Sequence, residues 1–297
     1  MTVSGFTIIR NGIKFNYYFV QSILSILPIC DEFIVNYGES EDDTLERLYE
    51  LKKQYPGKIK IIRTWWDDSI REGGKILSIQ TNIALAECSG DWCFYLQADE
   101  VVHEKYLDLI KENMKKNLNN KEVEGFAFNY LHFYSSFWTY FDRRPFYRRE
   151  VRIIRNKIGV KSYADAQGFR VWDEKKNKWR KPNVKLLDAY IYHYGWVRPE
   201  KIMIEKQKNL DKFWHDDSWI EINYQGKDRI FENFEGLKFF YGDHPKVMKD
   251  IIDKATWQKI PSEQDVKVKS ILKRILLFLE DKVFKTQFFE HKNYKII

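Results

Sequence analysis

The order of segments in the first hundred residues restricts the fold of this chain more than any other feature. Four short apolar segments, at residues 5–9, 32–37, 58–63 and 92–96, are separated by stretches in which apolar side chains recur every three or four positions. That spacing is typical of helices with one buried face. Strands that alternate with helices predict a parallel sheet covered on both faces. We therefore expect an α/β domain with a Rossmann-like, mostly parallel sheet.

The rest of the chain predicts further strands and then a helical extension. Three strand-like segments follow at residues 124–134, 151–155 and 184–194. From Arg198 onward the pattern is mainly helical, and residues 266–289 place their apolar side chains on one face. We expect this last helix to pack on its own domain, with a basic helix at a membrane surface as the alternative. The predicted division is a domain over residues 1–197 and a mainly helical C-terminal extension over residues 198–297.

Charge and cysteine content limit the partners and the compartment. The 297 residues carry 50 basic and 43 acidic side chains, a formal net charge of +7. This excess does not require a nucleic-acid partner, but it suits an anionic ligand or an anionic membrane surface. The three cysteines form no C-x-x-C pair, which favours a reducing compartment over a zinc knuckle. Without a recognisable signal peptide or a bilayer-long apolar run, we expect a cytoplasmic protein, with the inner face of the membrane left open.

The fourth apolar segment ends in two adjacent acids, Asp99 and Glu100. In an open α/β sheet, ligands bind beyond the carboxyl ends of the strands, so these acids fall where a ligand would lie. The alternative is that they begin the next helix, where acids are also favoured. No turn carries a G-x-G-x-x-G or Walker-type sequence, which argues against dinucleotide and P-loop chemistry.

Three passages, in this order, resemble the family-2 glycosyltransferases of GT-A fold. Residues 36–44, Asn-Tyr-Gly-Glu-Ser-Glu-Asp-Asp-Thr, are similar to the family's D-G-S-x-D-x-T turn. Residues 73–91 are similar to its G…A-R-N…A-x-G-D/E passage, and residues 96–100 stand in the place of its D-A-D-D/E motif. The resemblance covers about the first 105 residues well and extends more loosely to Trp196.

The resemblance implies a nucleotide-sugar donor that lies over the strand ends, with Mn²⁺ or Mg²⁺ bridging its diphosphate to the acidic motif. Such a cation stabilises the negative charge that develops on the departing diphosphate. Asp99 is then the first candidate for a metal and donor contact, and His193, at the end of a late strand, is the second metal candidate. The chain departs from the family where Gln97 replaces the first acid of the metal motif, and where Tyr37 and Gly38 replace the acids of the second-strand motif.

Further donor-binding candidates lie in the turns and loops that follow predicted strands. They are Arg10, Asn11, Glu39, Asp68 and Lys75. Glu39 is the acid nearest to the expected nucleoside, and Lys75, beside two glycines, is a candidate for the diphosphate. The alternative for each of them is an ordinary solvated side chain.

An inverting transfer needs a carboxylate that takes the proton of the acceptor hydroxyl. Asp165, on a turn between two predicted strands, is the candidate base, and Asp142 and Asp188 are its rivals. Glu100 is a second catalytic candidate. It would act as a ligand or as an orienting group, or it would only cap the following helix. The alternatives are a turn-forming role for Asp165 and a core role for His193.

Arginines crowd residues 143–155 together with Phe146 and Tyr147. Guanidinium groups match phosphate and carboxylate, so this segment is a candidate site for an anionic acceptor, with a solvated hairpin face as the alternative. His132 and His215 are interpreted as structural side chains.

The sequence is compatible with three classes of function. The first is an inverting, metal-assisted glycosyltransferase that extends a glycan or lipid-linked acceptor of a bacterial-type surface polysaccharide, with a peripheral membrane contact. The second is a nucleotidyltransferase on a similar sheet, although Arg10-Asn11-Gly12 is a poor match to the usual Gly-rich loop. The third is a non-catalytic module that binds carbohydrate or nucleic acid. The spread of basic residues along the whole chain argues against nucleic acid.

Overall fold

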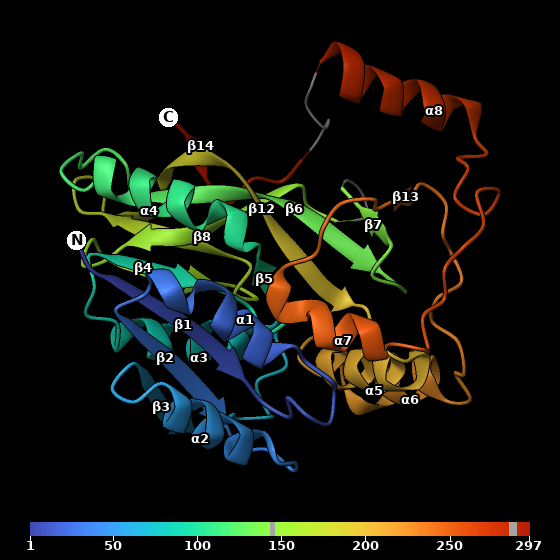
Figure 1. The fold of residues 1–297 in the computed structure, drawn as a ribbon, viewed down its shortest axis with the longest axis horizontal. Helices are drawn as coiled ribbons and strands as arrows, with labels where there is room; N and C mark the ends of the chain where they lie inside the picture. Colours follow the sequence, from blue (N-terminus) through green and yellow to red (C-terminus); the bar gives the residue numbers. More distant parts are fainter. Residues whose placement is uncertain (143–145, 285–289) are drawn as a thin grey trace.

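The computed structural model describes residues 1–142, 146–284 and 290–297 (Figure 1). Its centre is a parallel sheet in the order β4-β1-β2-β3. These strands span Trp92–Tyr95, Val3–Ile9, Glu32–Gly38 and Ile59–Thr64. They coincide with the four apolar segments of the sequence, so the predicted α/β class with its parallel sheet is confirmed.

The helices between these strands cover both faces of the sheet. The helices α1, α2 and α3 span Phe19–Ile26, Thr44–Gln54 and Lys75–Ala86. Within β2, Phe33 and Val35 join the apolar cluster that holds α1 and α2, whereas Ile34 joins the cluster that holds α3. Successive side chains of a strand point to opposite faces, so a continuous apolar run is buried on both sides. The prediction of helices on both faces is confirmed.

Beyond β4 the sheet continues with strands from the second half of the chain. The strands β8, β6, β7 and β13 follow in that order, over Arg149–Arg155, Gly125–Tyr134, Thr139–Phe141 and Lys238–Phe239. Strand β12 (Asn183–Trp196) runs parallel to β6 and also pairs, antiparallel, with the short β5 (Glu100–Val102). This pairing sets His193 opposite Glu100 and so brings the end of β12 to the end of β4.

Smaller elements complete the architecture. Helix α4 (Leu107–Lys116) packs its apolar side chains into the cluster that also holds α1. A separate antiparallel sheet holds β9, β10 and β11, over Val160–Tyr163, Gly168–Asp173 and Lys178–Arg180. Strand β14 (Lys295–Ile296) pairs with β12, so the last described residues return to the main sheet. Single 3₁₀ turns lie at Leu27–Ile29, Glu104–Tyr106 and Lys246–Met248, and a π-helical turn lies at Leu279–Val283.

The C-terminal part contains short helices and long connections. The helices α5, α6, α7 and α8 span Glu200–Asp211, Asp217–Tyr224, Lys249–Lys254 and Ile271–Phe278. Among the helices described, none is long and apolar enough to cross a bilayer. The predicted domain boundary at residue 197 stays a prediction, and α5, which begins just after it, packs against the main domain.

The last predicted helix differs most from its prediction. The sequence predicts one helix over residues 266–289, but α8 begins at Ile271 and ends at Phe278, and residues 285–289 lie outside the described residues. All eight residues of α8 are described, and none of them is buried. In Figure 1, α8 stands away from the sheet and its covering helices. The prediction that this helix packs on its own domain is therefore wrong, because no described core cluster takes up its apolar face.

Part of the arginine-rich segment is structural. Arg152 is buried and pairs with the equally buried Glu100, at 2.7 Å between Nε and a carboxylate oxygen. The guanidinium of Arg155 donates to backbone carbonyls of the loop after α4 at 2.9–3.0 Å. These two arginines are therefore not available to an anionic acceptor, which corrects that part of the prediction. Arg143 and Arg144 lie outside the described residues.

Candidate active site

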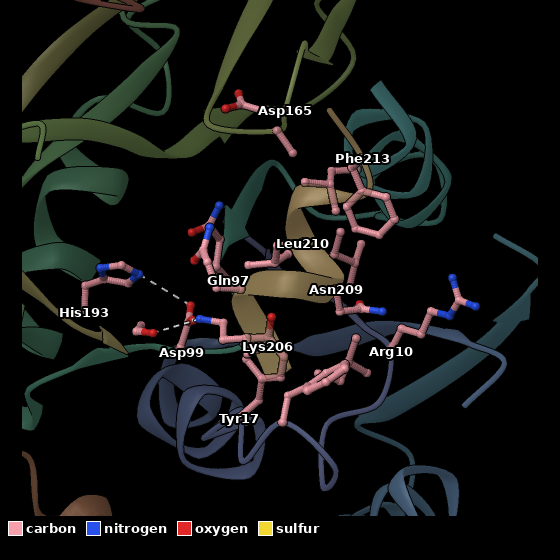
Figure 2. Close-up of a pocket in the computed structure, with 18 of the residues that line it drawn as sticks. Arg10, Tyr17, Gln97, Asp99, Asp165, His193, Lys206, Asn209, Leu210 and Phe213 are labelled. Carbon is pink, nitrogen blue, oxygen red and sulfur yellow. Dashed lines mark hydrogen bonds and ion pairs between the residues drawn. The ribbon is translucent and has the colours of Figure 1, made fainter. Parts of the chain in front are cut away.

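A cavity of about 270 Å³ lies at the carboxyl ends of β1 and β4, and α5 runs along it (Figure 2). Its chemistry-bearing side chains come from five separate parts of the chain. They are Arg10 after β1, Gln97 and Asp99 after β4, Asp165 between β9 and β10, His193 of β12, and Lys206 of α5. Ligands of α/β sheets bind at this edge. The sequence predicted this location from the acids that follow β4.

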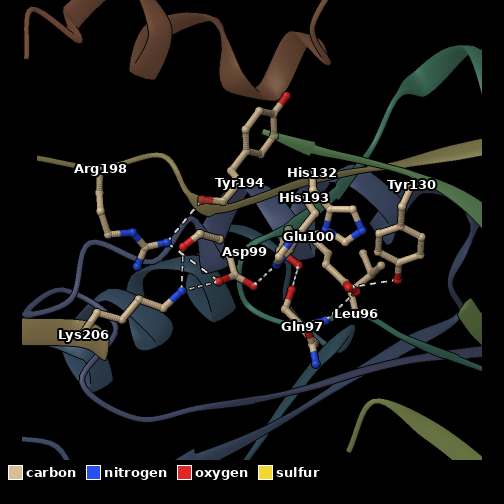
Figure 3. A network of polar contacts seen from close by, with 12 residues as sticks. Leu96, Gln97, Asp99, Glu100, Tyr130, His132, His193, Tyr194, Arg198 and Lys206 are labelled. Carbon is tan, nitrogen blue, oxygen red and sulfur yellow. Dashed lines mark hydrogen bonds and ion pairs between the residues drawn. The ribbon is translucent and has the colours of Figure 1, made fainter. Parts of the chain in front are cut away.

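Asp99 is the centre of the polar network in this cavity (Figure 3). The backbone N–H of Tyr194 donates to the Asp99 carbonyl at 2.8 Å, which fixes the β4–β5 turn against β12. The buried carboxylate lies 2.9 Å from Lys206 Nζ, 3.6 Å from His193 Nε2 and 3.8 Å from an Arg198 nitrogen. Burial alone would raise the pKa of Asp99, but Lys206, His193 and Arg198 outweigh it and hold that pKa well below its usual value.

Lys206 brings a buried ammonium to the carboxylate from α5. Its Nζ donates to Asp99 Oδ2 at 2.9 Å and to the Gly195 carbonyl at 2.8 Å, and it lies 4.8 Å from the centre of the Tyr17 ring. Burial, together with the nearby Arg198, lowers the pKa of Lys206 to about 8. An ammonium has three donors, and two described oxygens accept from this one. The third donor has no oxygen acceptor among the described residues, and the Tyr17 ring lies beside it.

His193 and His132 form a pair whose hydrogen bonds fix the tautomers. His132 Nε2 lies 2.7 Å from the Tyr147 carbonyl, which can only accept, so Nε2 carries the hydrogen. Burial, and next the charge of His193, hold the pKa of His132 well below its usual value, so this ring is neutral. Its Nδ1 therefore accepts from His193 Nδ1, 2.8 Å away. The other nitrogen of His193 is left to face Asp99.

Gly195 permits this close assembly of side chains. A Cβ at this position would lie 2.5 Å from His193 Nε2 and 3.2 Å from Asp99 Oδ2. Any larger residue would therefore separate the two groups that the sequence predicts to act together.

The positions of Asp99 and His193 fit the predicted divalent cation. Two ligands that each lie about 2.1 Å from one cation are separated by at most about 4.2 Å, and Asp99 Oδ1 lies 3.6 Å from His193 Nε2. The hydrogen bond to His132 leaves Nε2 as the coordinating nitrogen. Among the described residues, no group of three or more His, Cys, Asp or Glu side chains could hold a metal. The protein would thus supply two ligands, and the metal role of these residues stays a prediction.

Glu100 does not reach the cavity. Its two carboxylate oxygens accept from Arg152 at 2.7 and 2.8 Å, and Tyr130 donates to one of them at 2.9 Å. The side chain is fully buried. The prediction of a catalytic Glu100 is corrected, because its oxygens are enclosed within the sheet. Its ion pair instead joins the β4–β5 turn to β8.

Asp165 and Arg10 line the cavity at some distance from Asp99 (Figure 2), and their roles as base and donor contact stay predictions. Asp165 lies on the β9–β10 turn and accepts from the backbone N–H of Gln167 at 3.3 Å. Arg10 pairs with Asp68, with 3.0 Å between a guanidinium nitrogen and Asp68 Oδ2. This bond holds the pKa of Asp68 below its usual value.

Four other predicted donor contacts, Asp68 among them, do not belong to the described wall of the cavity. Asn11 is buried, has a positive φ of 53° and accepts from the Glu41 backbone N–H, so it shapes the turn after β1. Glu39 is exposed and pairs with Arg63 at 2.9 Å. Lys75 is exposed at the start of α3.

The remaining sequence candidates also lie elsewhere. Asp142 pairs with Lys238 at 2.6 Å, and Asp188 is exposed on β12. Neither rival base belongs to the described wall of the cavity. His215 stacks on Trp219, with ring centres 3.7 Å apart. His132, in contrast, is a buried side chain that contacts His193 directly.

Two residues next to Asp99, Lys206 and Arg198, were not predicted from the sequence. Arg198 follows shortly after β12. It is fully buried and donates to the Phe15 carbonyl at 2.7 Å. Lys206 shares the inward face of α5 with Met203 and Leu210. A lysine in the apolar stripe of a helix is the signal that would have found it, because lysine is rarely buried without a partner.

No family model matches this chain, and no curated protein matches it. Solved structures give weak likenesses. Residues 1–349 of Staphylococcus aureus TarS in complex with UDP are 12% identical, with a TM-score of 0.39 over 76% of this chain and 70% of that one. For residues 1–349 of TarS in complex with UDP-GlcNAc the identity is 16% and the TM-score is 0.31, over 45% of this chain and 35% of that one. That match thus spans about a third of the 1–349 chain of TarS.

A third likeness is to glucosyl-3-phosphoglycerate synthase from Mycobacterium tuberculosis, in complex with Mn²⁺, UDP and glucosyl-3-phosphoglycerate. It is 20% identical, with a TM-score of 0.28 over 43% of this chain and 44% of that one. Likenesses with TM-scores this low carry no argument about function.

Proposed function

We propose that this protein is a glycosyltransferase that takes a sugar from a nucleotide-diphosphate donor. The observation that carries the proposal is the surroundings of Asp99. This carboxylate follows a central parallel strand, in the place of the acidic motif of the GT-A enzymes that the sequence resembles, and it lines a cavity together with Lys206 and His193. A cavity at that edge with several cationic groups suits a ligand that carries a diphosphate.

The cationic groups have a clear task in such a reaction. When the sugar leaves its donor, negative charge develops on the diphosphate oxygens, and positive groups held in place beforehand stabilise it. Lys206 keeps one donor for this purpose, and Arg198 adds a second fixed positive charge. A divalent cation held by Asp99 and His193 would add further positive charge at the same place. His132 holds the His193 ring in the required orientation.

We propose that the transfer inverts the sugar and that Asp165 is the base. Inversion requires a carboxylate on the face of the sugar opposite the leaving group. Asp165 lines the cavity on the side away from Asp99, and its rivals Asp142 and Asp188 do not belong to the described wall. Arg10, paired with Asp68, is the remaining donor contact that the cavity supports, and it lies after the neighbouring strand β1.

The acceptor is proposed to be a glycan or a lipid-linked glycan, as expected for the assembly of a surface polysaccharide. For the same kind of acceptor we also propose a contact with the inner face of the membrane.

The test is turnover of a panel of UDP- and GDP-sugars, with and without Mn²⁺. We expect release of a nucleoside diphosphate from at least one donor. In Asp165→Asn this release should be lost when an acceptor is the nucleophile, but not when water is the nucleophile. Release of pyrophosphate from a nucleoside triphosphate would instead indicate a nucleotidyltransferase. Tight glycan binding without any turnover would indicate a binding module, and either result would contradict the proposal.

A further inference from the structure

Helix α8 exposes a continuous apolar face. Ile271, Leu272, Ile275 and Phe278 are 65%, 80%, 51% and 60% exposed. We call these four residues the α8 surface. They follow one another at the spacing of neighbours on one side of a helix. Single exposed apolar residues are normal on a protein, but a contiguous group marks a site of interaction.

The α8 surface faces away from the rest of the molecule. Lys273 Nζ donates to a carboxylate oxygen of Glu235 at 3.1 Å, so this side of the helix is turned toward the connection between α6 and β13. Ile275 follows two positions later, about 200° around the helix axis, and therefore lies on nearly the opposite side. Figure 1 shows α8 standing apart from the sheet.

The helix is a formed element and not the frayed end of a tail. Ser270 caps its first turn, with its hydroxyl accepting from the Lys273 backbone N–H. The segment before it is held at Val266, whose carbonyl accepts from Gly236 at 2.8 Å. The chain is thus attached to the body at the base of α8 while the α8 surface is left open.

Basic side chains lie within α8 and in the residues next to it. Residues 266–283 contain five basic and two acidic side chains. Lys267, Lys269 and Arg274 are exposed, and Arg274 lies beside Ile275 in the sequence. Exposed lysine and arginine next to an apolar helix face are the combination that binds anionic lipid headgroups while the apolar side chains enter the boundary of the acyl chains.

We propose that the α8 surface and the basic residues around it dock this protein on an anionic phospholipid membrane. The helix lies in the plane of the interface and does not span it, because its eight residues are far too few to cross a bilayer. Charge complementarity selects this partner over a second copy of the same chain, whose α8 would bring a further excess of positive charge. The proposal is independent of the chemistry in the cavity.

The first test is sedimentation with vesicles. We expect the protein to bind mixed phosphatidylcholine and phosphatidylglycerol vesicles, to bind pure phosphatidylcholine much less, and to be released by high salt. The variant Leu272→Asp/Ile275→Asp should bind at least about tenfold more weakly, since two side chains no longer enter the membrane. Because both residues are exposed, the thermal unfolding midpoint of this variant should match that of the wild type.

The matched control is Ile222→Asp, which places the same charge at an apolar residue that is 78% exposed on α6, away from α8. This variant should bind vesicles as the wild type does. A second pair separates local charge from net charge. Lys267→Glu/Lys269→Glu should abolish the preference for anionic lipid, whereas Lys175→Glu/Lys176→Glu, on the exposed β10–β11 connection, should retain most of it.

Three results would overturn the proposal. The first is equal binding to neutral and anionic vesicles, and the second is undiminished binding by the Leu272→Asp/Ile275→Asp variant. The third is a concentration-dependent dimer in analytical ultracentrifugation that the same variant dissolves, since a second copy would then cover the α8 surface.

Discussion

At the scale of single residues, the site depends on one buried carboxylate that lies close to two cationic side chains and a histidine. Asp99 contacts Lys206, and Arg198 and His193 lie within 4 Å of it. Removing an ion from water costs several kcal/mol, and only close partners offset that cost. The charges around Asp99 are therefore interdependent, and a change at one of them affects both the stability of the fold and the chemistry.

The variant Asp99→Asn tests this interdependence. It leaves Lys206 and Arg198 buried without an anion, so we expect the free energy of unfolding to fall by about 3–5 kcal/mol, measured by urea denaturation. Turnover should be lost as well. The double variant Asp99→Asn/Lys206→Met should regain part of the stability, because it also removes a buried charge, while turnover stays absent. If Asp99→Asn alone had the stability of the wild type, the result would contradict a stabilising ion pair between Asp99 and Lys206.

The pKa of Lys206 predicts opposite effects of pH on binding and on stability. This pKa is about 8 in the folded protein and 10.5 for a free lysine. Between these values the unfolded chain binds more protons, so the free energy of unfolding rises with pH, and below about pH 8 this contribution is constant. Diphosphate binding should fall over the same range, because the ammonium loses its charge.

Two variants check this prediction. In Lys206→Arg the fall in binding should move to higher pH, because a guanidinium stays charged. In Lys206→Met the rise in stability should disappear. A binding profile that is the same in the wild type and in Lys206→Arg would show that another group titrates.

The sequence pointed to Asp99 and His193 but not to Lys206. The first two follow strands, and the ends of strands in an α/β sheet meet at a predictable edge. Lys206 instead lies in a helix whose other charged residues face solvent. Which of its lysines turns inward depends on how α5 docks, and that is a property of the tertiary structure.

At the scale of elements, the β9–β10 turn carries the proposed base. We expect Asp165→Asn to lower kcat for transfer to an acceptor by about 100-fold or more, with the fold intact because the side chain is only half-buried. Asp188→Asn, at an exposed acid on β12, is the control and should leave kcat unchanged. Equal rates for both variants would remove Asp165 from the mechanism.

The predicted strands and helices of the first hundred residues agree with the structure, because apolar periodicity is a local property. Strand β5 has only three residues and lies within a segment that also reads as a helix start. Its pairing with β12 joins residues that are about ninety positions apart. This contact brings His193 to Asp99. The resemblance placed both residues at one predicted metal site, but no local pattern predicts the β5–β12 pairing that joins them.

At the scale of the whole molecule, the last described residues close the main sheet. Tyr294 is buried in the cluster that holds α3, and Asn293 donates to Glu150 at 2.8 Å. We expect Tyr294→Ala to lower the free energy of unfolding by about 3 kcal/mol. Tyr294→Phe should leave it unchanged or higher, because the buried hydroxyl has no hydrogen-bond partner among the described residues. Equal losses in both variants would contradict this packing.

The α8 surface shows why the outer parts of the molecule were harder to predict. The spacing of Ile271, Ile275 and Phe278 indicates that they share one side of a helix, and this is what the structure has. Periodicity does not reveal what covers that side. A helix face that packs on a core and a helix face that binds a membrane have the same apolar pattern. Only the path of the whole chain shows which of the two a given face is.

The central claim, that the Asp99 cavity binds a nucleoside diphosphate, is tested most directly by calorimetry with UDP and GDP in the presence of Mn²⁺. We predict that the wild type binds at least one of the two and that Lys206→Met weakens this binding by about tenfold or more. The control Lys201→Ala, at an exposed lysine of the same helix, should bind as the wild type does. If neither nucleotide binds the wild type, or if Lys206→Met binds with unchanged affinity, the account of this site is wrong.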